Sequence, residues 1–266
     1  MKLNLTKSIL LIASLFIAVG CSDSSSGNGN GKGNGNGKGN GNGQSQQSEQ
    51  GEDENCTGLP EAVESALISE KSTLNEELAN TISYMGNEER LAYDVYNRLY
   101  SEWGTNQFTN IATKSEYKHI SAVQQLVQKY KKSDAINFTN IDLPELGYLN
   151  TPIEEMKAGT YDIAKIQKLY DDLISIGLTS EVDALKVGCM VEVTDIDDLD
   201  KYLKMAQDSN AKDVEEVFNF LRDGSYNHYW AFDKGLTKKG IADGCCSLGT
   251  IDGINYCHPE YPQKEK

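Results

Sequence analysis

The sequence is poor in proline and in basic residues. The first shortage favours helices, and the second argues against a nucleic-acid partner. It has five prolines in 266 residues. None of them falls inside the four segments with the clearest hydrophobic periodicity, which favours long uninterrupted helices. Lysine and arginine together number 25 against 40 aspartates and glutamates, which gives a formal net charge of −15. Nucleic-acid phosphates require clustered basic side chains, so we expect no nucleic-acid partner.

Long apolar runs are scarce as well, and the run at residues 9–19 is short for a bilayer span. Residues 1–20 contain two lysines and no acid, a layout typical of a secretory signal. The run ends at AVGC, which resembles the lipobox of bacterial lipoproteins, and by that resemblance Cys21 carries the lipid. We expect an exported protein that a lipid anchors to a bacterial membrane, the outer membrane where the cell has one, facing the periplasm or the cell exterior. A plain signal with an incidental cysteine, or an uncleaved anchor, is the alternative.

The next segment repeats glycine and asparagine, and residues 27–44 contain no apolar side chain. Such a segment cannot bury enough surface to offset the entropy of ordering it. We therefore predict that residues 21–55 consist of the lipidated Cys21 and a disordered tether. Residues 56–240 are then one folded domain, and residues 241–266 are a cysteine-rich tail.

Beyond Cys21, an odd number of cysteines remains for the exported domain: Cys56, Cys189, Cys245, Cys246 and Cys257. Cys189 lies in the apolar run KVGCMVEV and is interpreted as a free buried residue. Neighbouring cysteines rarely bond each other, so we predict that Cys245 and Cys246 pair with Cys56 and Cys257, in either order. A metal site of these thiols with His258 is the alternative, although the spacing matches no zinc signature.

The hydrophobic pattern between the cysteines is helical and has no β-alternation of useful length. The four long periodic segments lie at residues 75–102, 109–130, 180–205 and 212–234. Residues 131–177 contain turn-forming residues and then a shorter amphipathic helix at residues 161–177. The sequence therefore predicts an all-α four-helix bundle with a helical excursion between the second and third bundle helices.

Polar side chains interrupt each apolar stripe near its middle, and two of the three histidines are among them. In chain order these are Glu89, Glu116, His119, Glu192, Asp195, Ser225 and His228. An unpaired buried carboxylate costs several kcal/mol, so four carboxylates facing one axis need a shared compensation. Metal cations would supply it, and carboxylates with imidazoles suit iron, manganese or zinc.

The segments around these residues resemble a known family. EERLAYDVY, SEYKHISAV, VEVTDIDDL and GSYNHYWAF are similar to the segments of the DUF2202 family, ferritin-like proteins of undefined function. The resemblance covers nearly all of residues 75–235. More distantly, Glu89-x-x-Ala92-x-x-x-Tyr96 and Glu116-x-x-His119 are similar to the first half of the rubrerythrin site. The resemblance implies a ferritin-like domain with an iron centre, in the di-iron form if both halves are complete.

The second half of that site departs from rubrerythrin. Glu192-x-x-Asp195 resembles the Glu-x-x-Glu of the third rubrerythrin helix, with one methylene less. Ser225 stands where rubrerythrin would carry its last glutamate, and this lowers the charge expected of the site and the affinity for a second metal. Tyr96 and Tyr229 are interpreted as core aromatics, with hydroxyl groups next to the site.

Three functions follow from this pattern. The first is a metal-dependent redox protein that uses dioxygen or peroxide. Its metal would be held by Glu89, Glu116, His119, Glu192 and His228, with Asp195 as a sixth ligand or a nearby base. The second is a lipoprotein that sequesters metal without turnover, and the third is a structural or interaction module that has lost its metal. Rubredoxin-type CxxC pairs are absent from the sequence, so a peroxidase cycle would need an external reductant, and enzymatic activity stays open.

The same side chains also have simpler interpretations. Glu89 has charged neighbours on both sides and would then lie in solvent. Asp195 precedes three further aspartates and would lie on a wet acidic face. His119 and His228 would be core histidines satisfied by hydrogen bonds.

Overall fold

The computed structural model describes residues 58–131, 157–161 and 163–263, and this part of the chain is almost entirely helical. The predicted all-α class is confirmed. The predicted signal at residues 1–20, the lipidated Cys21, the tether at residues 21–55 and Cys56 lie outside the described residues, as does much of the excursion. Among the helices that are described, none combines the length and the apolar character needed to cross a bilayer.

The four long periodic segments of the sequence are helical. They form α2 (Glu76–Trp103), α6 (Glu181–Asp208), α7 (Lys212–Lys238) and a composite helix of α3 (Asn106–Ile111), a π-helical turn (Ala112–Glu116) and α4 (Tyr117–Lys131). The side chains of Asn75 and Ser180 accept hydrogen bonds from backbone N–H groups in the first turns of α2 and α6. Gly104 ends α2 with a positive φ of 66°, which a residue without Cβ adopts at low cost.

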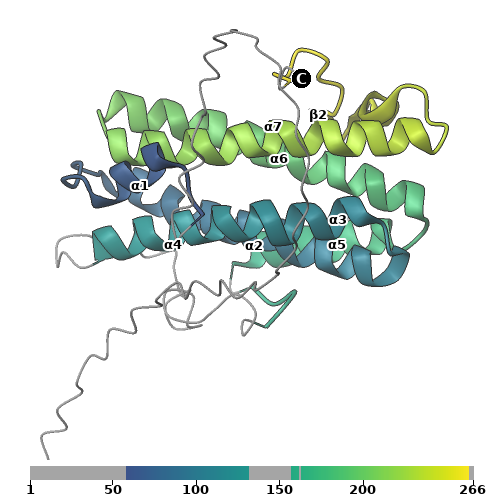
Figure 1. The fold of residues 1–266 in the computed structure, drawn as a ribbon, viewed down its shortest axis with the longest axis horizontal. Coiled ribbons are helices and arrows are strands. Elements are labelled where there is room, and N and C mark those ends of the chain that lie inside the picture. The colour runs from purple at the N-terminus through teal and green to yellow at the C-terminus, as the bar shows by residue number, and fades with distance from the viewer. Residues whose placement is uncertain (1–57, 132–156, 162, 264–266) are drawn as a thin grey trace, which may run out of the picture. The chain divides into compact units, whose positions relative to one another are not determined.

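The short elements are α1 (Glu61–Ile68), α5 (Ala164–Gly177), a 3₁₀ helix (Gly244–Leu248) and the antiparallel strands β1 (Thr250–Ile251) and β2 (Ile254–Asn255). Figure 1 shows α6 and α7 side by side in one layer, with α2 and α4 in a second layer. Since α2 packs on α4 and α6, and α7 packs on the same two helices, the four enclose a common interior.

That interior holds two apolar clusters with polar residues between them. One cluster takes its side chains from the first part of α2, from α4, and from the facing ends of α6 and α7, and it includes Leu126 and Phe218. The other takes its side chains from the rest of α2, from α3 and from the opposite ends of α6 and α7, and it includes Phe108 and Phe232. Each long helix passes from one cluster to the other near its polar interruption, so these interruptions fall at one level of the bundle.

Within the part of the excursion that the structure describes, α5 packs on both α2 and α6. Just before α5, the centre of the Tyr161 ring lies 4.7 Å from the Arg90 guanidinium. The same guanidinium donates hydrogen bonds to the backbone carbonyls of Lys157 and Thr160. Asp94 accepts hydrogen bonds from the Tyr161 hydroxyl at 2.6 Å and from the Gly159 N–H at 2.9 Å. Glu89 is 1% exposed, and its charged neighbours Glu88 and Arg90 are buried as well, so the interpretation of Glu89 as a solvated side chain is wrong.

Replacing Tyr161 with phenylalanine tests this packing. The change leaves the buried Asp94 carboxylate without one hydrogen bond, and we expect the free energy of unfolding to fall by about 1–2 kcal/mol. Urea denaturation of the two proteins measures the difference. Tyr117→Phe is the matched control, because Tyr117 is 40% exposed. If Tyr161→Phe were as stable as that control, the hydrogen bond to Asp94 would not be what holds the segment.

Two disulfides cross-link the C-terminal part. Cys189 on α6 bonds Cys245 in the 3₁₀ helix, and Cys246 bonds Cys257. The prediction of a free Cys189 is therefore wrong, whereas Cys246–Cys257 is one of the pairings that the sequence left open. The apolar run around Cys189 indicates that this residue is buried, but it does not indicate the bonding partner. That partner, Cys245, comes close to α6 because the chain runs back along α6 through α7. The Cys245 N–H donates to Asp233 Oδ1 at 2.9 Å, which fixes the 3₁₀ helix against α7.

The tail continues along α7. The Tyr229 hydroxyl donates to the Tyr256 carbonyl at 3.0 Å and accepts from the His258 N–H at 3.1 Å. The His258 ring stacks on Tyr261, with centroids 4.4 Å apart. Because Cys245, Cys246 and Cys257 are all in disulfides, none of these three is a thiolate that could bind a metal together with His258.

Candidate metal centre

Seven polar residues lie at the level between the two apolar clusters, and we call them the polar layer. They come from α2, the π turn, α4, α6 and α7: Glu89, Glu116, His119, Glu192, Asp195, Ser225 and His228. All are buried, none exceeding 8% exposure. The 3-4 spacing on each helix directs these side chains inward, so they share a small volume from which water is largely excluded.

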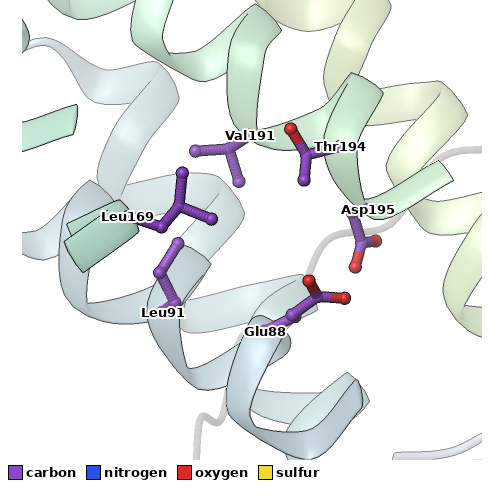
Figure 2. Close-up of a pocket in the computed structure, with 6 residues that line it drawn as sticks. All are labelled: Glu88, Leu91, Leu169, Val191, Thr194 and Asp195. Carbon is purple, nitrogen blue, oxygen red and sulfur yellow. The ribbon is translucent and has the colours of Figure 1, made fainter. Parts of the chain in front are cut away.

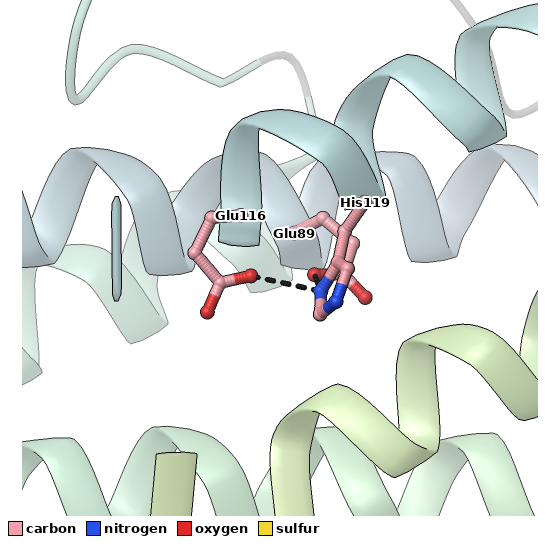
Figure 3. A group of neighbouring side chains, drawn as sticks. All are labelled: Glu89, Glu116 and His119. Carbon is pink, nitrogen blue, oxygen red and sulfur yellow. Dashed lines mark hydrogen bonds and ion pairs between the residues drawn. The ribbon is translucent and has the colours of Figure 1, made fainter. Parts of the chain in front are cut away.

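A first group of ligand atoms surrounds His119 (Figure 3). Its Nδ1 lies 2.9 Å from Glu89 Oε2 and 3.1 Å from Glu116 Oε2, so α2 and the composite helix each contribute a carboxylate. One ligand atom from each of the three residues lies within 4.8 Å of the others. This is the spacing that a single cation requires of its ligands before they close around it.

A second group surrounds His228. Its Nδ1 lies 2.9 Å from Glu116 Oε1 and 3.4 Å from Glu192 Oε2. These three residues also bring ligand atoms within 4.8 Å of one another. The two oxygens of Glu116 therefore face different histidines, whose rings are stacked with centroids 5.6 Å apart. Glu116 is the one residue that the two groups share, which is the arrangement of a bridging carboxylate.

The local structure around Glu116 and His119 explains this geometry. Glu116 is the last residue of the π turn, whose extra residue shifts the helix face on which the following side chains lie. The His119 ring then packs between α2 and α7. A Cβ on Gly224 of α7 would stand 2.3 Å from His119 Nε2, so only glycine leaves room for the ring there.

The charges of the polar layer are balanced by shared protons. Burial alone would raise the pKa of Glu116, but His228 and His119 outweigh it and hold that pKa below its ordinary value. Burial would lower the pKa of His228, but Glu116 and Glu192 raise it to about 9. Burial raises the pKa of Glu89 to about 8 even though His119 opposes the shift. Because metal ligands must give up their protons, a cation would replace these protons as the partner of the carboxylates.

Asp195 belongs to neither group of ligand atoms. Its Oδ2 accepts a hydrogen bond from Ser225 Oγ at 2.6 Å. The Ser225 hydroxyl is therefore hydrogen-bonded to this aspartate. Burial raises the pKa of Asp195 well above its ordinary value, and the charge of Glu89 adds to the shift. Asp195 is 8% exposed, which contradicts its interpretation as part of a wet acidic face.

The donors of the polar layer fit a cation. Glu192 Oε1 accepts a hydrogen bond from the Tyr96 hydroxyl, which leaves Oε2 directed toward His228. His228 Nδ1 has ion-pair contacts but no partner with hydrogen-bond geometry, and Glu89 Oε1 has none either. Buried polar atoms without partners are costly, and a divalent cation in each group would satisfy both atoms.

Two residues of functional interest were missed in the sequence. In the sequence Glu88 is only a charged neighbour of Glu89, yet it is 5% exposed and neither of its carboxyl oxygens has a hydrogen-bond partner. The other is Gly224, an isolated glycine inside a helical segment, and such a glycine indicates close packing. That signal was present in GSYNHYWAF, but the partner of the glycine, His119, lies more than a hundred residues earlier in the chain.

A Gly224→Ala variant tests the contact with His119. The added methyl group would overlap the imidazole and push it away from Glu89 and Glu116. We expect a loss of stability of about 1–3 kcal/mol from overpacking, together with weaker metal binding in the group that contains His119. Thermal melting and metal uptake measure the two effects. Gly240→Ala, where the added methyl would meet open space, is a control for glycine replacement, although its positive φ of 88° adds local strain. Unchanged metal uptake by Gly224→Ala would contradict the prediction.

Comparisons with known proteins match this chain to one family model and to one relative of known structure. The model of an uncharacterized protein domain, DUF2202, matches residues 79–250, a range that contains the whole polar layer. "Uncharacterized protein MJ0754" of Methanocaldococcus jannaschii is 35% identical over 170 residues, which are 64% of this chain and 80% of that protein. The crystal structure of hypothetical protein MJ0754 from Methanococcus jannaschii DSM 2661 has 35% sequence identity and a TM-score of 0.53. That comparison covers 65% of this chain and 86% of the other.

Proposed function

Because this chain belongs to the DUF2202 family, we propose that its polar layer is the metal centre of a ferritin-like protein, with two cations, iron being the favoured metal. The observation that carries the proposal is that two groups of buried carboxylate and imidazole ligands share Glu116. One cation would be held by Glu89, His119 and Glu116, and the other by Glu192, His228 and Glu116. Mixed oxygen and nitrogen ligands suit iron, manganese and zinc.

Bound iron would supply redox chemistry toward dioxygen or peroxide, and the first function we propose is such an oxidoreductase. The residues of the chain orient and shield the site. The Tyr96 hydroxyl holds Glu192 in one orientation, and the apolar clusters on both sides keep bulk water out. The Ser225–Asp195 pair lies beside the ligands, where Asp195 can accept or release a proton.

The second candidate is a protein that binds and sequesters metal without turnover. The observation that favours it is the state of the sulfur atoms: the four cysteines that the structure describes form two disulfides, and the sequence contains no CxxC pair. An internal thiol donor of electrons is therefore missing from the described part. Consumption of dioxygen or peroxide by the iron-loaded protein separates the two candidates, because a sequestering protein would hold metal without consuming either.

The proposal is tested by elemental analysis of protein purified without added metal, combined with melting in the presence and absence of chelator. A metal bound only by the folded state raises Tm, so chelator should lower the Tm of the parent protein. His119→Ala should lower metal content and make Tm insensitive to chelator. His258→Ala is the matched control, since it removes a histidine that packs in the tail. A parent protein that holds less than about one equivalent of metal and ignores chelator would favour a structural module.

We also propose export and lipid anchoring at Cys21. The two disulfides fit an oxidising compartment outside the cytoplasm, and the AVGC motif supports the anchor. Cys21→Ser is expected to move the protein from the membrane fraction to the soluble fraction. Fractionation after an alkaline wash measures this, with Cys56→Ser as the control cysteine variant. Retention of Cys21→Ser in the membranes would point to a different anchor.

A further inference from the structure

A small pocket lies beside the polar layer, between α2, α5 and α6. Its walls are formed by Glu88, Leu91, Leu169, Val191, Thr194 and Asp195. Figure 2 shows Glu88 of α2 and Asp195 of α6 directing their carboxyl groups toward one another at one side, with the aliphatic side chains at the other. The cavity volume is about 10 Å³, which is room for roughly one water-sized particle. Leu169 and Thr194 are partly exposed, so the pocket reaches the surface.

Three of the four carboxyl oxygens in this pocket have no hydrogen-bond partner. Glu88 is only 5% exposed, and neither of its carboxyl oxygens has a hydrogen-bond partner. Asp195 Oδ1 has none either, while its Oδ2 is held by Ser225. Buried acceptors without donors are costly, so a pocket that collects three of them is suited to a cation. The aliphatic wall offers no further ligand, which makes such a site weak.

The pocket lies between the surface and the proposed metal centre. On its inner side, Asp195 follows Glu192 by one helical turn and is bonded to Ser225 of the polar layer. On its outer side, Asp198 follows by another turn, and its charge is the one that acts most strongly on Glu88. Asp198 pairs with Lys201 at 2.6 Å, and the Lys201 side chain is 66% exposed. Carboxylates therefore extend from an exposed ion pair to the ligands of the centre.

We propose that Glu88 and Asp195 form a transient cation site through which divalent metal reaches the centre, an inference that rests on the proposed function. Two carboxylates can replace part of the hydration shell of a divalent cation, but two ligand groups hold it less tightly than the larger ligand sets of the centre. A site that is strong enough to admit a cation and too weak to keep it has the properties of a passage. The second Asp195 oxygen, fixed by Ser225, keeps this carboxylate between the pocket and the centre.

Cobalt(II) uptake measured by stopped-flow absorbance tests the passage, because the cobalt spectrum reports binding to the centre. Glu88→Gln keeps the shape of the side chain and removes its charge. We expect its rate of uptake to fall by about tenfold or more, while the final amount of cobalt bound equals that of the parent. Leu169→Trp fills the mouth of the pocket without changing a charge and should also slow uptake. Asp223→Asn, an exposed acid on α7, removes the same charge elsewhere and should leave the rate unchanged.

The outcomes separate this inference from the function on which it rests. Equal rates for Glu88→Gln, Leu169→Trp and the parent would overturn the passage while leaving the metal centre intact. A lower final amount of cobalt in Glu88→Gln would make Glu88 a permanent ligand and would also overturn it. A parent that binds no cobalt would remove the proposed centre itself, and the passage with it.

Discussion

A Glu116→Gln variant is expected to lose both metal positions at once. Glu116 Oε2 faces His119 and Oε1 faces His228, so one substitution removes a ligand from each group. Glu89→Gln and Glu192→Gln each remove a ligand from one group only and should therefore retain one of two equivalents of metal. Glutamine preserves the volume of the side chain, so cavity formation does not contribute to the difference.

Elemental analysis and melting with and without metal measure this result. Metal at a hundred times its dissociation constant stabilises the folded state by about 2.7 kcal/mol, and Glu116→Gln should lose this gain. Each variant is compared with its own metal-free form, because removal of the carboxylate also leaves two buried imidazoles without their shared partner. If Glu116→Gln kept as much metal as Glu89→Gln, the two groups would be independent and Glu116 would not bridge them.

Removal of the Cys189–Cys245 disulfide is expected to have the largest effect on stability. The bond joins residues 56 apart in the sequence, and the chain-entropy model gives a loss of about 4 kcal/mol when both cysteines become alanine. The model gives about 3 kcal/mol for the Cys246–Cys257 bond, which spans 11 residues. Cys189 lies one turn before Glu192, so the first bond also holds the part of α6 that enters the metal centre.

Urea denaturation without reductant measures both double variants, and each serves as the control for the other. The Cys189→Ala/Cys245→Ala protein should unfold at the lower urea concentration. Alkylation of the unreduced parent should leave Cys189 unmodified even after denaturation. Modification of Cys189 under those conditions would show that the bond is not formed in the protein.

Much of the polar layer could be predicted from helical periodicity alone. Glu116 and His119 are three residues apart, as are Glu192 and Asp195, and residues at this spacing share a helix face. The apolar residues around them show that the face is buried, and the near absence of proline indicates that the helices continue through it. These are local properties, so the sequence is sufficient to predict an all-α fold and the positions of these residues within it.

Other features depend on which helices meet. Arg90 is buried because the segment before α5 packs over it, and Glu88 is buried because it lies between α2, α5 and α6. Nothing local to EER indicates either cover. Asp195 turns toward Ser225, and Glu116 rather than another carboxylate lies between the histidines, because α6, α7 and the π turn meet at one level. The partner of Cys189 is likewise set by the return of the chain after α7. Local periodicity is therefore sufficient to predict the faces of the helices, whereas the partner of each face depends on the fold, because those contacts join residues far apart in the chain.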